Sequence, residues 1–290
     1  MKAIWIITKM TFHEAIRKRI VLTGLVLGIL FLLAFSLGFH FIMTQVDQKN
    51  IEDLAGAPTN AHVVSRIIDR EGTNMLMLAG LYAVTFLSVA MGALLASDTL
   101  SGEINSGTIQ TIVAKPLRRS DVVLGKWLGF AWLLGLYFLL LGGGVVMVVY
   151  LRSGYLPDGL LAGLGLIYLE TLLVMTLSLM CSSIFSALAT GGTVFGLYGL
   201  AFIGGWIEQI GAVLRNETAI QVGIVTSLVI PSEALWRRAA YEMQSSIAGI
   251  LGMSPFGTTS VPSTLMVVYA GLYLVVALAL AVRFFGERDL

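Results

Sequence analysis

Few residues of this chain have types and spacings that could support covalent chemistry. A nucleotide-binding P-loop needs the pattern G-x-x-x-x-G-K-[ST]. The nearest piece, Gly125-Lys126, is followed by Trp127 and lacks the upstream glycine. The three histidines have no metal-ligand spacing, and no Ser/His/Asp or Cys/His set is evident. We therefore expect no catalytic residue, no metal and no cofactor in this chain, which should not hydrolyse ATP alone.

Glu170 is the one ionisable residue deep within a long apolar run. A bare carboxylate in lipid costs roughly 3 kcal/mol on insertion scales. Its helix face should therefore meet protein or a water-filled path. Two roles stay open for Glu170: a substrate-pathway or gating group, and a protonated carboxyl that hydrogen-bonds a neighbouring helix. The same face carries small or weakly polar residues, namely Gly159, Gly163, Ile167, Val174, Ser178 and Cys181.

The segment Asp98–Lys126 is the richest in polar residues and turn formers. Thr108–Ala114 is a short apolar helix candidate, which Pro116 would end. Ser120 is a candidate N-cap for the next helix, and Asp121 would favour the positive end of that helix. We predict a short helix parallel to the membrane between two rigid spans, able to transmit a push from a soluble partner. An ordinary loop is the open alternative.

The composition indicates what must position these residues. Of 290 residues, 57% are hydrophobic and 12% are charged, whereas soluble domains are about 25% charged. A net charge of +1 gives no field that would draw nucleic acid. About 20 apolar residues make a helix that crosses the bilayer, and backbone groups in lipid must pair within the helix. We therefore predict an all-α, polytopic membrane protein with six spans, at Ile20–Met43, Met75–Ser97, Trp127–Leu151, Leu160–Ser183, Ala187–Ile207 and Thr264–Phe285.

Lysine and arginine predict the orientation, because they are enriched in cytoplasmic loops. Eleven of them fall on the side of both termini and the 98–126 segment, and seven fall in the longer loops opposite. We expect an inner, cytoplasmic membrane location with both termini in the cytoplasm. Residues 1–19 form a basic, amphipathic segment that predicts an interfacial helix on the inner leaflet, or else a basic flank that only sets the topology.

Two outer segments are longer than the topology requires. Thr44–Asn74 is polar and is punctuated by Gly56 and Pro58. Residues 208–263 contain an apolar stretch, Ala219–Ile230, which is too short to span and too apolar for an open loop. It predicts a re-entrant segment before the last span. Ser232 is then a candidate N-cap for a helix whose Trp236, Arg237, Arg238 and Tyr241 would anchor it at the interface or dock an outer partner.

The 98–126 segment resembles the membrane subunit of type-2 ABC exporters. In that family the pattern E…GTI…P-x-x-R…GK lies between the second and third spans. Here it occurs as Glu103, Gly107-Thr108-Ile109, Pro116, Arg119 and Gly125-Lys126. The basic N-terminal helix, the six spans and the re-entrant segment extend the resemblance over nearly the whole chain. Within the family the chain is most similar to permeases with short N-terminal elbows, such as the subunit paired with copper-site maturation of nitrous oxide reductase. Arg118 departs from the pattern, because a small hydroxyl residue is common there.

The resemblance implies a single permease domain, 1–290, which pairs with a second permease subunit, identical or related. Each permease would bind a separate ABC ATPase that holds the ATP and Mg. The segment 98–126 would relay ATPase motion, and an exported substrate would pass between the two permeases. The coupling residues implied are Glu103, Gly107, Thr108, Ile109, Pro116, Arg119 and Lys126. Two other functions remain open: an ion-coupled carrier that uses Glu170 as its proton site, and a non-transporting scaffold.

Overall fold

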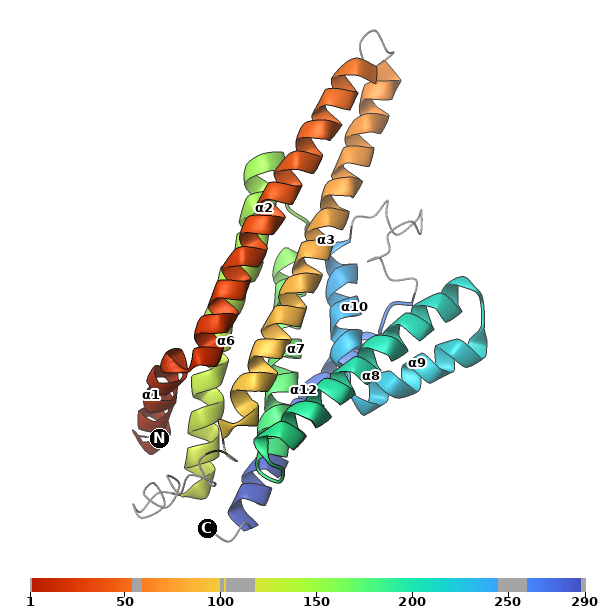
Figure 1. Ribbon diagram of the computed structural model, residues 1–290. Helices are drawn as coiled ribbons and strands as arrows, with labels where there is room; N and C mark the ends of the chain where they lie inside the picture. The colour runs from red at the N-terminus through yellow and green to blue at the C-terminus, as the bar shows by residue number, and fades with distance from the viewer. Residues whose placement is uncertain (1, 54–58, 100–101, 103–117, 245–259, 288–290) are drawn as a thin grey trace.

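Every regular element in the described part of the chain is a helix (Figure 1). The computed structural model describes residues 2–53, 59–99, 102, 118–244 and 260–287. The all-α prediction is therefore confirmed. The helices are α1 (Lys2–Arg17), α2 (Arg19–Asp53), α3 (Thr59–Ser97), α6 (Arg119–Ser153), α7 (Leu160–Ser182), α8 (Ala187–Val213), α9 (Glu217–Val229), α10 (Ser232–Met243) and α12 (Thr264–Glu287).

Six of these helices, α2, α3, α6, α7, α8 and α12, are long and apolar enough to cross a membrane, and they coincide with the six predicted runs. The uncharged turn between the fourth and fifth spans is also where the sequence predicts it. There the backbone N–H groups of Ile184 and Phe185 donate to the carbonyl oxygen of Cys181, so α7 closes with a tight turn before α8 begins.

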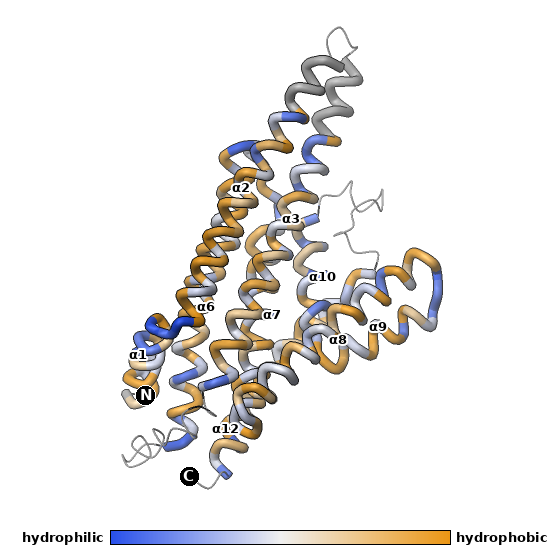
Figure 2. Tube along the Cα trace, in the orientation of Figure 1, coloured by the Kyte–Doolittle hydropathy of each residue, from blue (hydrophilic) through white to orange (hydrophobic). Residues whose placement is uncertain are grey.

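The first two spans continue well past the bilayer. α2 has 35 residues and α3 has 39, and at 1.5 Å per residue each is about 50–60 Å long, against about 30 Å of hydrocarbon. Much of the predicted polar segment Thr44–Asn74 is therefore helical, and the two helices rise side by side above the bundle (Figure 1). Figure 2 shows the apolar stretch of α2 beside α6 and the hydrophilic junction where α1 meets α2.

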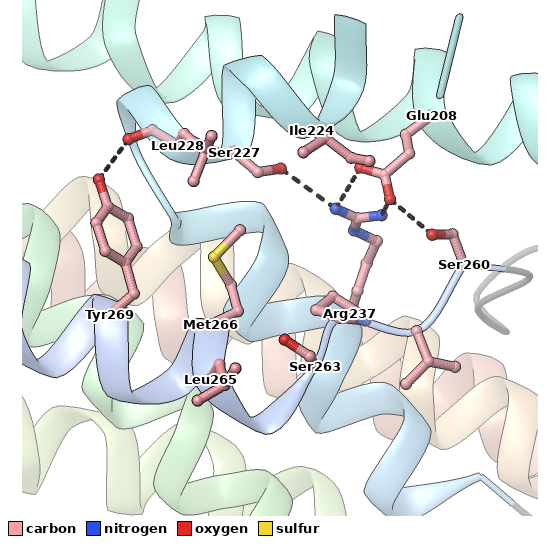
Figure 3. A pocket seen from close by; sticks show the side chains of 12 residues that line it. Glu208, Ile224, Ser227, Leu228, Arg237, Ser260, Ser263, Leu265, Met266 and Tyr269 are labelled. Atoms are coloured by element: carbon pink, nitrogen blue, oxygen red, sulfur yellow. Dashed lines mark hydrogen bonds and ion pairs between the residues drawn. The ribbon is translucent and has the colours of Figure 1, made fainter. Parts of the chain in front are cut away.

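The predicted re-entrant segment is a bent helix pair. α9 folds back along α8, and α10 leaves α9 at 107° across a break at Ile230-Pro231. Asn216 caps α9, since its side-chain oxygen accepts from the Ala219 N–H at 3.2 Å. Ser232 is not the cap of α10: Pro231 holds that position, and the Ser232 hydroxyl is buried with no hydrogen bond to any described residue. At the other end of the break, the Tyr269 hydroxyl of α12 donates to the Leu228 carbonyl oxygen at 2.6 Å (Figure 3).

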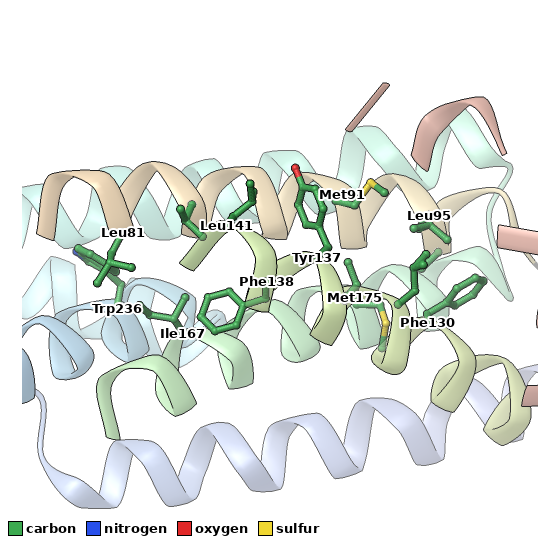
Figure 4. Close-up of a cluster of buried hydrophobic side chains, with 14 of the residues drawn as sticks. Leu81, Met91, Leu95, Phe130, Tyr137, Phe138, Leu141, Ile167, Met175 and Trp236 are labelled. Carbon is green, nitrogen blue, oxygen red and sulfur yellow. The ribbon is translucent and has the colours of Figure 1, made fainter. Parts of the chain in front are cut away.

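α7 lies at the centre of the bundle, where it packs against α3, α10 and α12. Its side chains interleave with those of α3 and α6 in a closed apolar core that includes Leu81, Leu141 and Ile167 (Figure 4). Lipid is as apolar as this core, so polar contacts between helices help to define the packing. One such contact joins α7 to α3: the Ser178 hydroxyl donates to the Ala93 carbonyl oxygen at 2.7 Å.

Candidate functional site

The predicted coupling residues divide between described and undescribed parts of the chain. Of the two that the structure describes, Arg119 opens α6 and donates from Nη1 to the Gly286 carbonyl oxygen of α12 at 2.8 Å. Lys126, two turns later, is buried. The start of α6 is therefore fastened to the end of the last span. Five predicted residues lie outside the described residues, namely Glu103, Gly107, Thr108, Ile109 and Pro116.

The predicted cap of α6 is wrong by two positions. The helix begins at Arg119 with Arg118 in the N-cap position, and the Arg118 side chain makes no capping hydrogen bond. Ser120 is already inside the helix. Asp121 does lie in the first turn, where a negative charge is favoured by the helix dipole.

α1 is seated on α6 through two glycines at GxxxG spacing. A Cβ atom at Gly125 would lie 2.7 Å from Ile7 Cβ, and one at Gly129 would lie 2.9 Å from Thr11 Cβ. Any larger residue at these positions would push the two helices apart. Outside this contact, Trp5 of α1 is exposed. That exposed aromatic agrees with the prediction of an interfacial helix, which stays a prediction.

Glu170 is fully buried in α7, with 0% of the residue exposed. Neither carboxylate oxygen has a hydrogen-bond partner among the described residues. The hydrogen bond to a neighbouring helix, one of the two open roles, is therefore not seen within them. The predicted weakly polar face of α7 does face protein, because Ile167, Val174 and Ser178 are all buried.

A second acidic side chain is buried in the re-entrant pair. Glu233 lies on α10, which packs against α7, the helix that carries Glu170. The Glu233 side chain lies over Gly205 of α8, where a Cβ atom would come within 2.3 Å of Glu233 Cγ. On the α3 side, the Tyr82 ring lies 4.7 Å, centre to centre, from the Trp236 ring. Four helices, α3, α7, α8 and α10, thus build one acidic and aromatic cluster.

One turn beyond Glu233, Arg237 forms a buried ion pair with Glu208 of α8 (Figure 3). Arg237 Nη1 lies 2.7 Å from Glu208 Oε1, and Nη2 donates to Glu208 Oε2 at 2.8 Å. Nη2 also reaches the Ser227 hydroxyl at 3.3 Å, and the Ser260 hydroxyl donates to Glu208 Oε1 at 2.7 Å. α10 thus carries a charged line along one side, from Glu233 to Arg237.

This burial corrects one prediction for α10. Arg237 and Trp236 were expected to anchor the helix at the interface or to dock a partner, but both are buried. Only the end of the helix fits the expectation: Tyr241 is exposed, and the Arg238 guanidinium lies 5.4 Å from the centre of its ring.

Glu208 and Glu233 were missed by the sequence reasoning. The available signal was the i, i+4 spacing of Glu233 and Arg237, which puts opposite charges on one helix face directly after the re-entrant apolar stretch. No cluster of three or more His, Cys, Asp or Glu in the described ranges could hold a metal ion.

Comparison with known proteins agrees with this geometry. A family model described as "ABC-2 family transporter protein" matches residues 5–290. The chain is also similar to the ABC transporter permease protein NatB of Bacillus subtilis (strain 168), with 26% identity over 106 residues. That match covers 32% of this chain and 28% of the relative.

Proposed function

Because the chain belongs to the ABC-2 family of transporter proteins, and is a transmembrane permease of an ABC transporter, we propose that it forms the translocation path for an exported substrate. A separate ATPase subunit supplies the energy. The observation that carries the proposal is the family match over nearly the whole chain, in a sequence without a P-loop.

The proposed coupling element is the segment 98–126. It links the end of α3 to the start of α6, two helices that run far across the bundle. The start of α6 also contacts α1 through Gly125 and α12 through Arg119. A push on the segment would therefore reach three helices at once, which supports a role in transmitting ATPase motion.

Two permeases are proposed to meet along α8. Its glycines Gly192, Gly196 and Gly199 form a stripe at i, i+4 and i+7, where an added Cβ atom would meet nothing within 4 Å in the described chain. Glycine stripes let a second helix approach closely in a membrane. The partner is a second copy of this chain or a related permease.

The candidate pathway group is Glu170, with the buried Glu233 on the adjoining helix α10. The ion-coupled carrier remains the alternative, favoured by one observation: the Glu170 carboxyl has no hydrogen-bond partner among the described residues. A carrier would transport its substrate without any ATPase and would lose this activity on Glu170→Gln. The proposed exporter would need the ATPase whatever residue stands at position 170.

The coupling test compares Ile109→Asp with Arg118→Ser. The tagged chain is purified from membranes with its ATPase, and ATP hydrolysis by the complex is compared with hydrolysis by the ATPase alone. In the unmodified complex, the permease should stimulate ATP hydrolysis by the ATPase. A charge at Ile109 should abolish this stimulation while the complex still assembles, whereas Arg118→Ser should leave the stimulation unchanged. Full stimulation in Ile109→Asp, or a purified complex that contains no P-loop subunit, would overturn the proposal.

A further inference from the structure

A cavity of about 430 Å³ opens beside the buried ion pair (Figure 3). It lies among α8, α9, α10 and α12, and residues 260–263 close one side of it. Its volume falls within the range of about 300–1,000 Å³ that is usual for small-molecule sites. The cavity lies away from Glu170, which does not line it.

The polar wall of the cavity consists of Arg237, Glu208, Ser227 and Ser260. The guanidinium and the carboxylate neutralise each other, so the wall presents a dipole without net charge. Arg237 is only 1% exposed, and neither its Nε nor its Nη1 makes a hydrogen bond to a described residue, although Nη1 is in ion-pair contact with Glu208. Donors of a buried cation are therefore still available to an acceptor, and a buried donor without an acceptor is costly.

The mouth of the cavity is apolar and opens at the surface of the chain. Leu265 of α12 is 78% exposed and Leu228 of α9 is 50% exposed, and Ile224 and Val261 are exposed as well. In a multi-pass membrane protein these side chains meet lipid rather than water. The cavity thus joins a hydrocarbon environment to a dipolar wall.

We propose that this cavity binds a phospholipid with a zwitterionic head group. Its phosphate lies toward Arg237, its ammonium group toward Glu208, and its acyl chains along Leu265 and Leu228. A head group with net charge would leave that charge unpaired beside a neutral ion pair in a medium of low dielectric constant, where unpaired charge is expensive. A zwitterion brings no net charge and places each end against its complement. This proposed lipid site does not depend on the transport role, and it would be the same whatever substrate is transported.

The test uses the full chain without its ATPase, purified in detergent and labelled with a photoactivatable phosphatidylethanolamine. Leu265→Trp would fill the mouth and should lower cross-linking to the residues around the cavity about tenfold. Val268→Trp is the matched control, because Val268 lies one turn along α12, is exposed, and does not line the cavity. It should label like the unmodified chain.

Competition then separates the head groups. Unlabelled phosphatidylcholine should displace the probe, and phosphatidylglycerol, which carries a net negative charge, should do so at least about tenfold less well. The double variant Glu208→Gln, Arg237→Gln removes the dipole and should abolish this preference, with thermal unfolding reporting whether the variant is folded. Equal labelling of the two tryptophan variants, or equal competition by the two lipids with the unmodified chain, would overturn the proposal.

Discussion

Arg237 and Glu208 show how one residue pair can tie the re-entrant segment to the bundle. Taking two charges out of water is expensive, and the cost is offset only where the geometry is good and further hydrogen bonds are made. Here Nη2 donates to one Glu208 oxygen, Nη1 lies 2.7 Å from the other, and Ser227 and Ser260 add two more contacts. Because Glu208 is on α8 and Arg237 is on α10, this ion pair joins the span α8 to the bent helices α9 and α10.

Removal of one partner should be much worse than removal of both. We expect Arg237→Met to lower the free energy of unfolding by about 3–5 kcal/mol, since it leaves the Glu208 charge buried and unpaired. Adding Glu208→Gln to Arg237→Met should recover most of the loss. The double-mutant cycle is measured by denaturant unfolding of the purified protein.

Arg238→Met is the control for this cycle. Arg238 makes an ion pair with Glu242 one turn away, and both side chains are partly exposed, so its removal should cost only about 0–1 kcal/mol. Equal losses from Arg237→Met and Arg238→Met would contradict the role assigned to the buried pair.

At the scale of elements, the packing of α1 on α6 depends on two missing side chains. Gly125 and Gly129 bring the helices so close that a Cβ atom at either position would overlap α1. The packing of α1 on α6 holds the hydrophilic bend between α1 and α2 beside the bundle (Figure 2). This bend contains Arg17, Lys18 and Arg19.

Gly125→Leu and Gly129→Leu should release α1 from α6. Arg17 and Arg19 are already exposed, but a released α1 would let the helices around the bend unfold, so trypsin should cleave after Arg17 to Arg19 faster in these variants than in the unmodified protein. Gly143→Leu is the control, since it adds the same side chain to α6 where an added Cβ atom meets nothing within 4 Å. If all three variants are cleaved at the unmodified rate, α1 does not depend on this contact.

A second prediction at this scale concerns α8. Gly196→Trp should block close approach of another helix and shift the purified permease from dimer toward monomer, with an association constant lower by at least about tenfold. Gly271→Trp on α12 is the matched control, because an added Cβ atom there also meets nothing within 4 Å. Mass measurement by light scattering reads the outcome. A dimer that survives Gly196→Trp unchanged would place the interface elsewhere.

For the whole molecule, the sequence also predicts which end of the bundle faces the cytoplasm. The distribution of lysine and arginine predicts that both termini and the α7–α8 turn are inside. The α8–α9 turn, and with it the ion pair and the cavity, would then lie toward the outside.

Single cysteines in a Cys181→Ala background test this orientation. Ser186→Cys lies in the α7–α8 turn and Asn216→Cys in the α8–α9 turn, and both positions are exposed. A membrane-impermeant maleimide should label Asn216→Cys in intact cells, and Ser186→Cys only after the membrane is opened. The reverse pattern would invert the proposed topology and place the 98–126 segment outside.

The number and position of the spans follow from the sequence because a bilayer responds to local composition. A run of about 20 apolar residues enters lipid as a helix whatever its neighbours are. The six predicted runs therefore match six helices. The same local logic located the bent pair, since Ala219–Ile230 is apolar and Pro231 interrupts it. It made no prediction of helix in Thr44–Asn74, because polar residues beyond the bilayer can continue a helix as well as end it.

The contacts between helices were decided only by the tertiary structure. Glu208 and Arg237 are 29 residues apart on different helices, and nothing in either local sequence indicates that they pair. The Glu170 carboxyl, which has no hydrogen-bond partner among the described residues, and the packing of α1 on Gly125 likewise depend on how helices cross. The length of an apolar run is a property of one segment alone, whereas packing depends on two surfaces. A glycine or a buried charge therefore acquires its role only from the surface that it contacts.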